Sequence, residues 1–235
     1  LTYGGVITGS TAFTKSGAGT LVLSGTNTYT GATTISAGTL RLGASNIIVN
    51  SSALTANGTF DLNDYSETIA DLAGNGTVDL GSGTLTTIQF NSSTYSGSIT
   101  GSGSFVKSGG GILTLSGSTD FTGGITIQVG TIKLAANNVI ADTNAITFSD
   151  SGMFADAATL DLNDYSDTVG TLTANYTDAR ILLGSGTLTV NQAAGADTSF
   201  KGIISETGGL TKSGSGTLTL TATNTYTGLT TVSAG

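Results

Sequence analysis

The feature that most constrains this 235-residue chain is internal repetition at two levels. Residues 13–43 read FTKSGAGTLVLSGTNTYTGATTISAGTLRLG, and similar segments return at 105–135 and, in part, at 210–235. Between these copies, FDLNDYSETIADL at 60–72 returns as LDLNDYSDTVGTL at 160–172. Self-similarity of this kind is typical of solenoid proteins, in which each repeat packs only on its neighbours.

The copies divide the chain into super-repeats of about a hundred residues, with approximate bounds 1–92, 93–197 and a partial 198–235. Their length differences fall in short insertions, chiefly after Asn137 and around residues 178–180, where loops leaving a solenoid are expected. We expect 1–235 to be a single continuous segment of a longer protein, because the chain begins inside a repeat.

The local pattern predicts short strands rather than helices. Leu21 and Leu23 alternate with Thr20 and Val22, a period of two that gives each strand one apolar face. Gly and β-branched residues dominate, which disfavours helix, and no segment has a 3.6-residue period. Gly, Asn and Ser bound each apolar run, so the strands are about four to six residues long.

The spacing of these strands favours a parallel β-helix. Leu21 and Leu40 are 19 residues apart, and so are Leu113 and Ile132. A return every 18–20 residues fits one rung of a solenoid, each rung lying about 4.8 Å above the last. An antiparallel β-sandwich remains the alternative, since short strands with frequent turns also fit it.

Three kinds of residue mark equivalent positions in the copies, and we expect them to be structural. Inward leucines should stack from rung to rung, an aromatic residue should pack between strands, and the glycine after it should form a corner. These positions are Leu21, Leu23, Leu40, Leu113, Leu115, Leu218 and Leu220; Tyr29, Phe121 and Tyr226; and Gly31, Gly123 and Gly228.

The composition excludes several kinds of chemistry. The chain has no His and no Cys, so it has no Ser-His-Asp triad, thiol nucleophile, Cys/His zinc site or disulfide. With a net charge of −8 it should repel nucleic acid and anionic membranes. We expect no cofactor.

A duplicated carboxylate cluster offers the best chemical constellation, at Asp61, Asp64 and Glu67 and again at Asp161, Asp164 and Asp167. Paired carboxylates serve glycoside hydrolysis, and oxygen donors in this spacing suit calcium, for which the candidates are Asp61, Asp64, Asp161 and Asp164. We favour a structural interpretation, in which the Asn-Asp pairs form turns, because an active site is seldom copied once per repeat.

Basic residues also occupy equivalent positions. Lys15, Lys107 and Lys212 share one position, and Arg41 and Lys133 share another. We expect all five to point outward and to keep a neutral Thr-rich surface soluble. The alternative is a stripe of charges that contacts a ligand or a neighbouring molecule.

The segment GTLVLSGTNTYTGATTISAGTLRLG at Gly19–Gly43 resembles the passenger-associated transport repeat of Gram-negative autotransporters. The copy ending at Gly235 matches nearly as well, whereas the copy at Gly111–Leu134 departs at Asp120-Phe121 and at Val129. The resemblance implies a right-handed β-helix exported through an outer-membrane barrel elsewhere in the full-length chain. It also implies an extracellular or outer-membrane surface location, often within an adhesin.

Two functions remain open at this stage. The first is a non-enzymatic adhesive stalk, acting as a rigid spacer or a self-associating rod that contacts host cells, neighbouring cells or matrix. The alternative is a polysaccharide lyase or hydrolase that uses carboxylates such as Asp61 and Asp64. Such lyases usually need a basic residue close to the carboxylates, and Arg41 and Arg180 lie about seven rungs apart.

Overall fold

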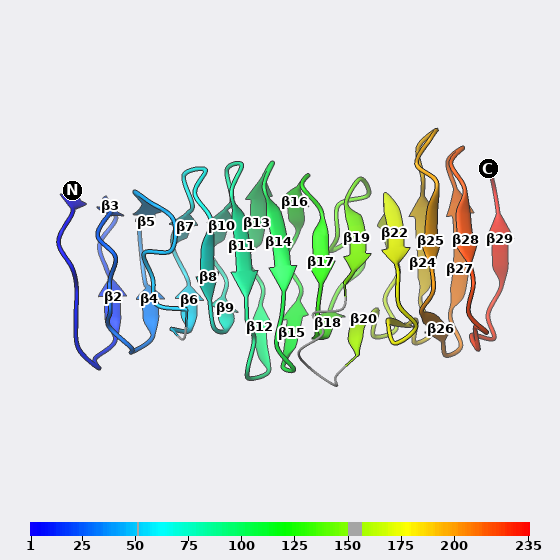
Figure 1. Cartoon of the computed structure of the whole chain (residues 1–235), viewed down its shortest axis with the longest axis horizontal. Coiled ribbons are helices and arrows are strands. Elements are labelled where there is room, and N and C mark those ends of the chain that lie inside the picture. Colours follow the sequence, from blue (N-terminus) through cyan, green and yellow to red (C-terminus); the bar gives the residue numbers. More distant parts are fainter. Residues whose placement is uncertain (51, 150–156) are drawn as a thin grey trace.

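The computed structural model describes residues 1–50, 52–149 and 157–235. Within these residues the chain forms 29 short strands and no helix, as the Gly- and Thr-rich sequence predicts. The strands stack as a solenoid of about 11 turns, with the two termini at opposite ends of its long axis (Figure 1). Among the described residues, none lies in a helix that is long and apolar enough to cross a membrane.

The strands form three faces, which the chain visits in the order face 1, face 2, face 3. Face 1 begins with a seven-stranded sheet of β1 (Thr2–Tyr3), β3 (Thr20–Leu23), β5 (Thr39–Leu42), β7 (Thr59–Asp61), β10 (Thr77–Asp79), β13 (Ser98–Gly101) and β16 (Thr119–Phe121). It continues as a four-stranded sheet of β21 (Asp167–Val169), β24 (Thr187–Asn191), β27 (Gly209–Ser213) and β29 (Thr230–Val232). A parallel bridge from Thr119 to Ile140 begins the link between the two sheets, and the Asp167 carboxylate, which accepts the Ile140 N–H, completes it.

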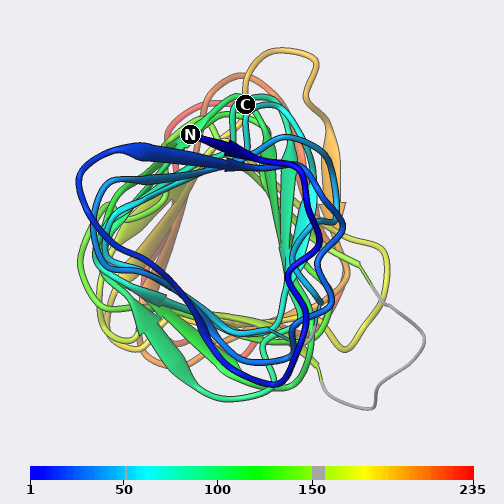
Figure 2. The ribbon, with the colours of Figure 1, turned by 90° about the vertical axis from the view of Figure 1, so that its left-hand side faces the viewer.

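Faces 2 and 3 are continuous sheets. Face 2 contains β8 (Glu67–Ile69), β11 (Thr84–Thr87), β14 (Ser104–Lys107), β17 (Ile125–Ile127), β19 (Ala145–Phe148), β22 (Thr171–Ala174), β25 (Thr198–Phe200) and β28 (Leu218–Leu220). Face 3 contains β2 (Phe13–Lys15), β4 (Thr33–Ile35), β6 (Leu54–Ala56), β9 (Leu72–Gly74), β12 (Ser93–Tyr95), β15 (Ile112–Leu115), β18 (Gly130–Leu134), β20 (Ala158–Asp161), β23 (Arg180–Leu182) and β26 (Ile203–Ser205). The view along the axis shows these faces closing around a common interior (Figure 2).

The strand pairing confirms the parallel β-helix and rejects the antiparallel sandwich. Strands pair in parallel throughout the described residues, with Leu21 beside Leu40 and Leu113 beside Ile132 as the 19-residue spacing predicts. One rung lengthens to 28 residues, between Ile132 and Leu160, where the first super-repeat has 20 residues between Leu40 and Phe60.

The core is one continuous column of inward side chains. Alternation places every second strand residue inside, so Leu40, Phe60, Val78 and Ile99 stack on face 1 with no exposure. Outward threonines lie between them and remain partly exposed. Burial of this apolar column, at about 25 cal/mol per Å², is the main stabilising contribution in a chain without disulfides.

Equivalent residues of successive super-repeats do not lie on the same face. Lys15 ends β2 on face 3, Lys107 ends β14 on face 2, and Lys212 lies in β27 on face 1. From each lysine to the next the chain makes four turns and then advances two further faces. One super-repeat therefore returns its side chains on a different side of the solenoid.

Candidate functional site

The three equivalent lysines point inward, so the expectation that they solubilise the surface was wrong. Lys15, Lys107 and Lys212 are all buried, with exposures of 7%, 0% and 9%. The ammonium of Lys107 donates to three carbonyl oxygens, at 3.1 Å from Ser108, 2.7 Å from Gly109 and 3.0 Å from Val129. Lys15 and Lys212 make the same three bonds with their own neighbours.

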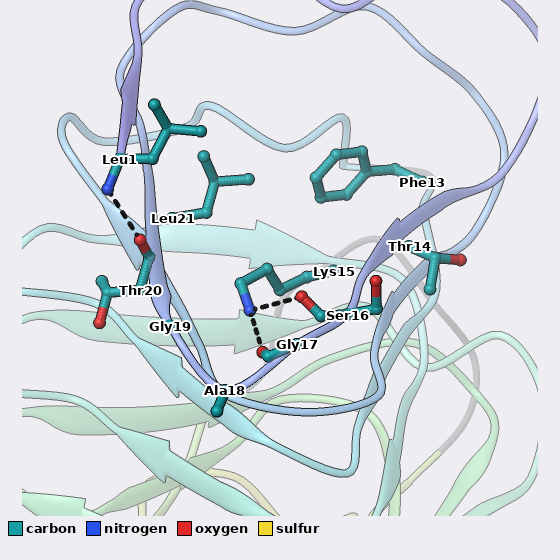
Figure 3. A pocket seen from close by; sticks show the side chains of 10 residues that line it. All are labelled: Leu1, Phe13, Thr14, Lys15, Ser16, Gly17, Ala18, Gly19, Thr20 and Leu21. Atoms are coloured by element: carbon teal, nitrogen blue, oxygen red, sulfur yellow. Dashed lines mark hydrogen bonds between the residues drawn. The ribbon is translucent and has the colours of Figure 1, made fainter.

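Two of the three carbonyls belong to the corner that follows the lysine, and the third belongs to the next rung. Figure 3 shows the first two for Lys15, whose ammonium meets Ser16 and Gly17 beside a hollow of about 370 Å³ at the first rung. The third acceptor is 22 residues ahead, at Ala37. We call this arrangement the lysine clamp, because one side chain ties a corner to the rung above it.

The environment of Lys107 explains its electrostatics. Burial lowers the pKa of Lys107 to about 8, and the nearby Asp71 carboxylate opposes part of that shift. Gly130, with a φ of 73°, leaves room for the clamp, since an added Cβ there would lie 2.4 Å from the Gly109 carbonyl oxygen, which accepts from Lys107, and 2.9 Å from the Lys107 ammonium nitrogen. The clamp therefore depends on a glycine in the next rung as well as on the lysine.

The duplicated carboxylate segments form two copies of one turn. Asn63 and Asp64 have left-handed φ values of 49° and 68°, and Asn163 and Asp164 have 50° and 71°. In the first copy the Asp61 carboxylate accepts the Asn63 N–H at 2.8 Å. The Asp64 carboxylate accepts the N–H of Ser82 in the next rung, also at 2.8 Å. The second copy repeats both distances.

The third carboxylate of each segment is buried and bonds elsewhere. Glu67 accepts the N–H groups of Ile47 and Ile48 at 2.9 and 3.2 Å, and Asp167 accepts those of Val139 and Ile140 at 2.8 and 3.2 Å. Burial raises the pKa of Glu67 to about 7 and that of Asp167 to about 6, although these backbone donors favour the charged forms.

Asp161 and Asp164 line one hollow of about 530 Å³ together with Glu206 and Lys133, whereas Asp167 is buried and bonds elsewhere. Within residues 1–50, 52–149 and 157–235, no three acidic groups converge in a way that could hold a metal ion. Asp61, Asp64, Asp161 and Asp164 each satisfy a neighbouring backbone donor, which is what the structural interpretation requires of them. The interpretation stays a prediction, because calcium binding and catalysis are matters for experiment.

Arg41 and Lys133 do lie on the outside, as expected, but they pair within the chain. The Arg41 guanidinium donates to Asp61 at 2.6 Å, and the Lys133 ammonium lies 3.4 Å from Asp161. The basic side chains remain 46% and 35% exposed, so each pair contributes little to stability.

The aromatic position is buried in two of its three copies. Tyr29 and Phe121 are inside, while Tyr226, near the last rung, is half-buried. Burial raises the pKa of Tyr29, whose hydroxyl lies 2.6 Å from Thr33. Tyr226 forms the same bond with Thr230.

The glycines that follow are needed for close packing, not for an unusual backbone angle. An added Cβ at Gly31 or Gly123 would lie 2.4 or 2.3 Å from backbone atoms of the preceding rung, and at Gly228 the distance would be 2.2 Å. None of the three has a positive φ. The expected corner residue is therefore a contact residue between rungs.

The leucine positions follow their place along the solenoid. Leu23, Leu40, Leu113 and Leu115 are buried. Leu21, Leu218 and Leu220 are half-buried, because they belong to the rungs nearest the two ends.

Sequence comparison identifies the repeated segments. The family model described as Passenger-associated-transport-repeat matches residues 13–42, 105–134 and 210–235. The chain is 39% identical over 239 residues to the Adhesin BmaC autotransporter of Brucella suis biovar 1 (strain 1330). That alignment covers 100% of this chain but 7% of the relative, so the chain spans a small part of the curated protein that it matches. No solved structure matches the chain.

Proposed function

We propose that the chain, a passenger segment of an autotransporter with an extracellular or outer-membrane surface location in a Gram-negative bacterium, serves there as an adhesive stalk that catalyses no reaction. Its relative is named an adhesin, which supports adhesion as the role of the longer protein. The stalk places binding surfaces at a distance from the membrane, and a barrel elsewhere in the full-length chain anchors it.

The main support from the structure is the use that the solenoid makes of its charged groups. Five of the seven basic residues bond within the solenoid, either to backbone carbonyls or to an aspartate in the next rung. The duplicated carboxylates likewise cap neighbouring backbone groups. Charged side chains that bond within the solenoid stiffen it, and a stiff rod suits the role of a spacer.

Surface display of the full-length protein tests the proposal. A non-adherent Gram-negative host expresses the protein with or without residues 1–235, and adherence to epithelial monolayers and matrix-coated plates is counted. We expect deletion to lower adherence, and an unrelated solenoid with the same number of turns to restore the part that depends on length alone. Undiminished adherence after deletion would contradict the proposal.

The enzymatic alternative has its own measurement. Release of sugar from candidate glycans is followed for the wild type and for the double variant Asp161→Asn and Asp164→Asn. We expect no release from either protein. If the wild type releases sugar and the double variant does not, the function is that of a polysaccharide-acting enzyme and the proposed adhesive stalk is wrong.

A further inference from the structure

Among the described residues away from the two end rungs, Phe90 is the most exposed large apolar side chain, at 62%. It lies in residues 88–92, the loop that joins β11 on face 2 to β12 on face 3 (Figure 1). Single exposed apolar residues are common on protein surfaces, so exposure alone carries no functional meaning. The hydrogen bonds that hold this loop in one conformation give the exposed ring its functional interest.

One carboxylate fastens the loop from the preceding rung. Asp71 Oδ1 accepts the N–H of Phe90 at 2.7 Å and that of Asn91 at 3.0 Å. Its Oδ2 accepts the Asn91 side-chain amide at 2.6 Å. Hydrogen bonds to a charged acceptor are stronger than neutral ones, so Asp71 fixes the backbone at Phe90 itself.

A buried glutamine fastens the same loop from inside. Gln89 is fully buried, and its Nε2 donates to the Asn91 carbonyl at 2.6 Å and to Ser93 Oγ at 2.7 Å. Its Oε1 lies 3.1 Å from the hydroxyl of Thr87. Gln89 also has a left-handed φ of 39°, a conformation that costs energy for a residue with a side chain and persists only where the surroundings impose it.

The corresponding loop of the second super-repeat, between β24 and β25, keeps a buried glutamine but lacks the carboxylate. Ala193 follows Gln192 where Phe90 follows Gln89, and Thr171 stands in the place of Asp71. Val190 replaces Thr87, and Gln192 Oε1 consequently has no partner. Gln192 nevertheless keeps the two bonds of its Nε2, to the Ala196 carbonyl at 2.6 Å and to Thr198 Oγ1 at 2.8 Å. The two loops therefore differ chiefly in the carboxylate, which is present beside the phenylalanine and absent beside the alanine.

We propose that residues 89–92 form a preformed protein-binding knob, in which Phe90 enters an apolar pocket of a partner protein whose rim carries Lys or Arg opposite Asp71. Interface hot spots are often aromatic anchors that fill a pocket of the partner, and rigidity lowers the entropy lost on binding. The chain's net charge of −8 and the Asp71 carboxylate beside the ring favour a basic partner.

A second apolar side chain enlarges the knob. Ser93 pairs with Leu113 of the next rung, so Ile112, which precedes Leu113 on β15, lies beside residue 92. The side chain of Ile112 is 37% exposed. The inference rests on the proposed adhesive function, because it names the surface through which part of the adhesion would occur.

The test displays the full-length protein on a non-adherent host and counts adherence to epithelial monolayers, with and without protease treatment of the monolayer. We expect Phe90→Ala to lower adherence at least about tenfold, the scale of a hot-spot truncation. Asp71→Thr should give an intermediate loss, because Phe90 remains but its loop is freed. Protease treatment should abolish the difference between wild type and Phe90→Ala.

The chain supplies two matched controls. Tyr65→Ala removes another exposed aromatic residue of the same super-repeat, and Ala193→Phe adds a ring to the corresponding loop, which has no carboxylate in the place of Asp71. Neither should change adherence. Backbone NMR relaxation of the 235-residue chain should show residues 90–92 as rigid as the strands, and more mobile in Asp71→Thr.

The outcomes separate the knob from the stalk. Wild-type adherence that Phe90→Ala leaves intact overturns the knob and leaves the proposed function standing. A loop at 90–92 that is mobile in the wild type also overturns the knob, whatever the adherence. Absence of wild-type adherence to every monolayer counts against both.

Discussion

The first and second super-repeats build the same corner from different chemistry. In the first, the Tyr29 hydroxyl lies 2.6 Å from Thr33, which lies 3.3 Å from Ser52, and Ser52 donates to the Gly31 carbonyl at 2.7 Å. This chain of hydroxyls is buried. It crosses from one rung to the next and ends on the backbone.

In the second super-repeat the chain of hydroxyls is gone. Phe121 replaces the tyrosine and Ile125 replaces the threonine, so both partners of the first bond are lost together. Asn144 stands in the place of Ser52, and neither atom of its buried amide has a partner. Tyr29 and Thr33 are thus exchanged together, which avoids leaving either hydroxyl unsatisfied, whereas the replacement of Ser52 by Asn144 leaves a buried amide without a partner.

The largest expected effect concerns a feature that the super-repeats share. Lys107→Met keeps the apolar stem but leaves two corner carbonyls and one carbonyl of the next rung without their donor, so the free energy of unfolding should fall by about 3 kcal/mol. Urea denaturation measures the loss. Lys133→Met, which breaks only an exposed ion pair, is the control and should cost under about 1 kcal/mol. Equal effects of the two substitutions would show that the clamp adds nothing.

The buried acids differ between the super-repeats by one methylene, and their pH windows should differ too. The pKa of Glu67 is raised from 4.5 to about 7, so its folded state binds the proton more tightly than the unfolded state. The contribution of Glu67 to stability should therefore be greatest below pH 4.5 and decline as the pH rises toward 7, by up to about 3 kcal/mol.

For Asp167 the decline should fall between 3.8 and about 6. Unfolding midpoints in urea from pH 4 to 8 measure both windows. Glu67→Gln should remove the upper part of the decline and Asp167→Asn the lower part. A decline that neither substitution alters would have to come from other groups.

The corner itself provides a pairwise test. Thr33→Val leaves the buried Tyr29 hydroxyl without its partner and should cost about 2 kcal/mol. The double variant Tyr29→Phe and Thr33→Val reproduces the apolar corner of the second super-repeat. Its cost should be smaller than the sum of the single costs by about 1 kcal/mol, which a double-mutant cycle measures. Strict additivity would mean that the two hydroxyls are independent.

The smallest expected effect is a gain. Asn144→Ser restores the side chain of the first super-repeat, removes an unsatisfied amide and allows its hydroxyl to reach the Gly123 carbonyl, the counterpart of the acceptor of Ser52. Stability should rise by about 1 kcal/mol. The same substitution in the opposite direction, Ser52→Asn, should lower it. A loss in Asn144→Ser would indicate that the amide fills space that serine leaves empty.

The sequence predicted the fold well because the relevant signal is periodic. Alternation of apolar residues identified strands such as Thr20–Leu23, and the 19-residue return from Leu21 to Leu40 distinguished stacked rungs from hairpins. The inner faces and the rung length follow from these two periods alone.

The prediction that the lysines point outward was wrong because it followed their charge and ignored the alternation of inward and outward positions along each strand. Lys15 has the same parity as Phe13, two residues earlier, and Lys107 has the parity of Phe105, so alternation itself placed them inside. The partners of the lysines could not be predicted in the same way. Carbonyls of a corner converge only after the backbone turns, and the third one comes from a rung that the local sequence does not describe.

The advance of four turns and two faces per super-repeat has a geometric consequence for a longer rod. Three super-repeats make fourteen turns before an outward pair such as Arg41 with Asp61 faces the same direction again, a rise of about 70 Å at one strand spacing per turn. The counterparts of this pair in the two intervening super-repeats point to the other two faces of the solenoid. Such a rod offers the same surface to targets approaching from any side, but a flat target meets only every third copy, which limits the avidity that it gains.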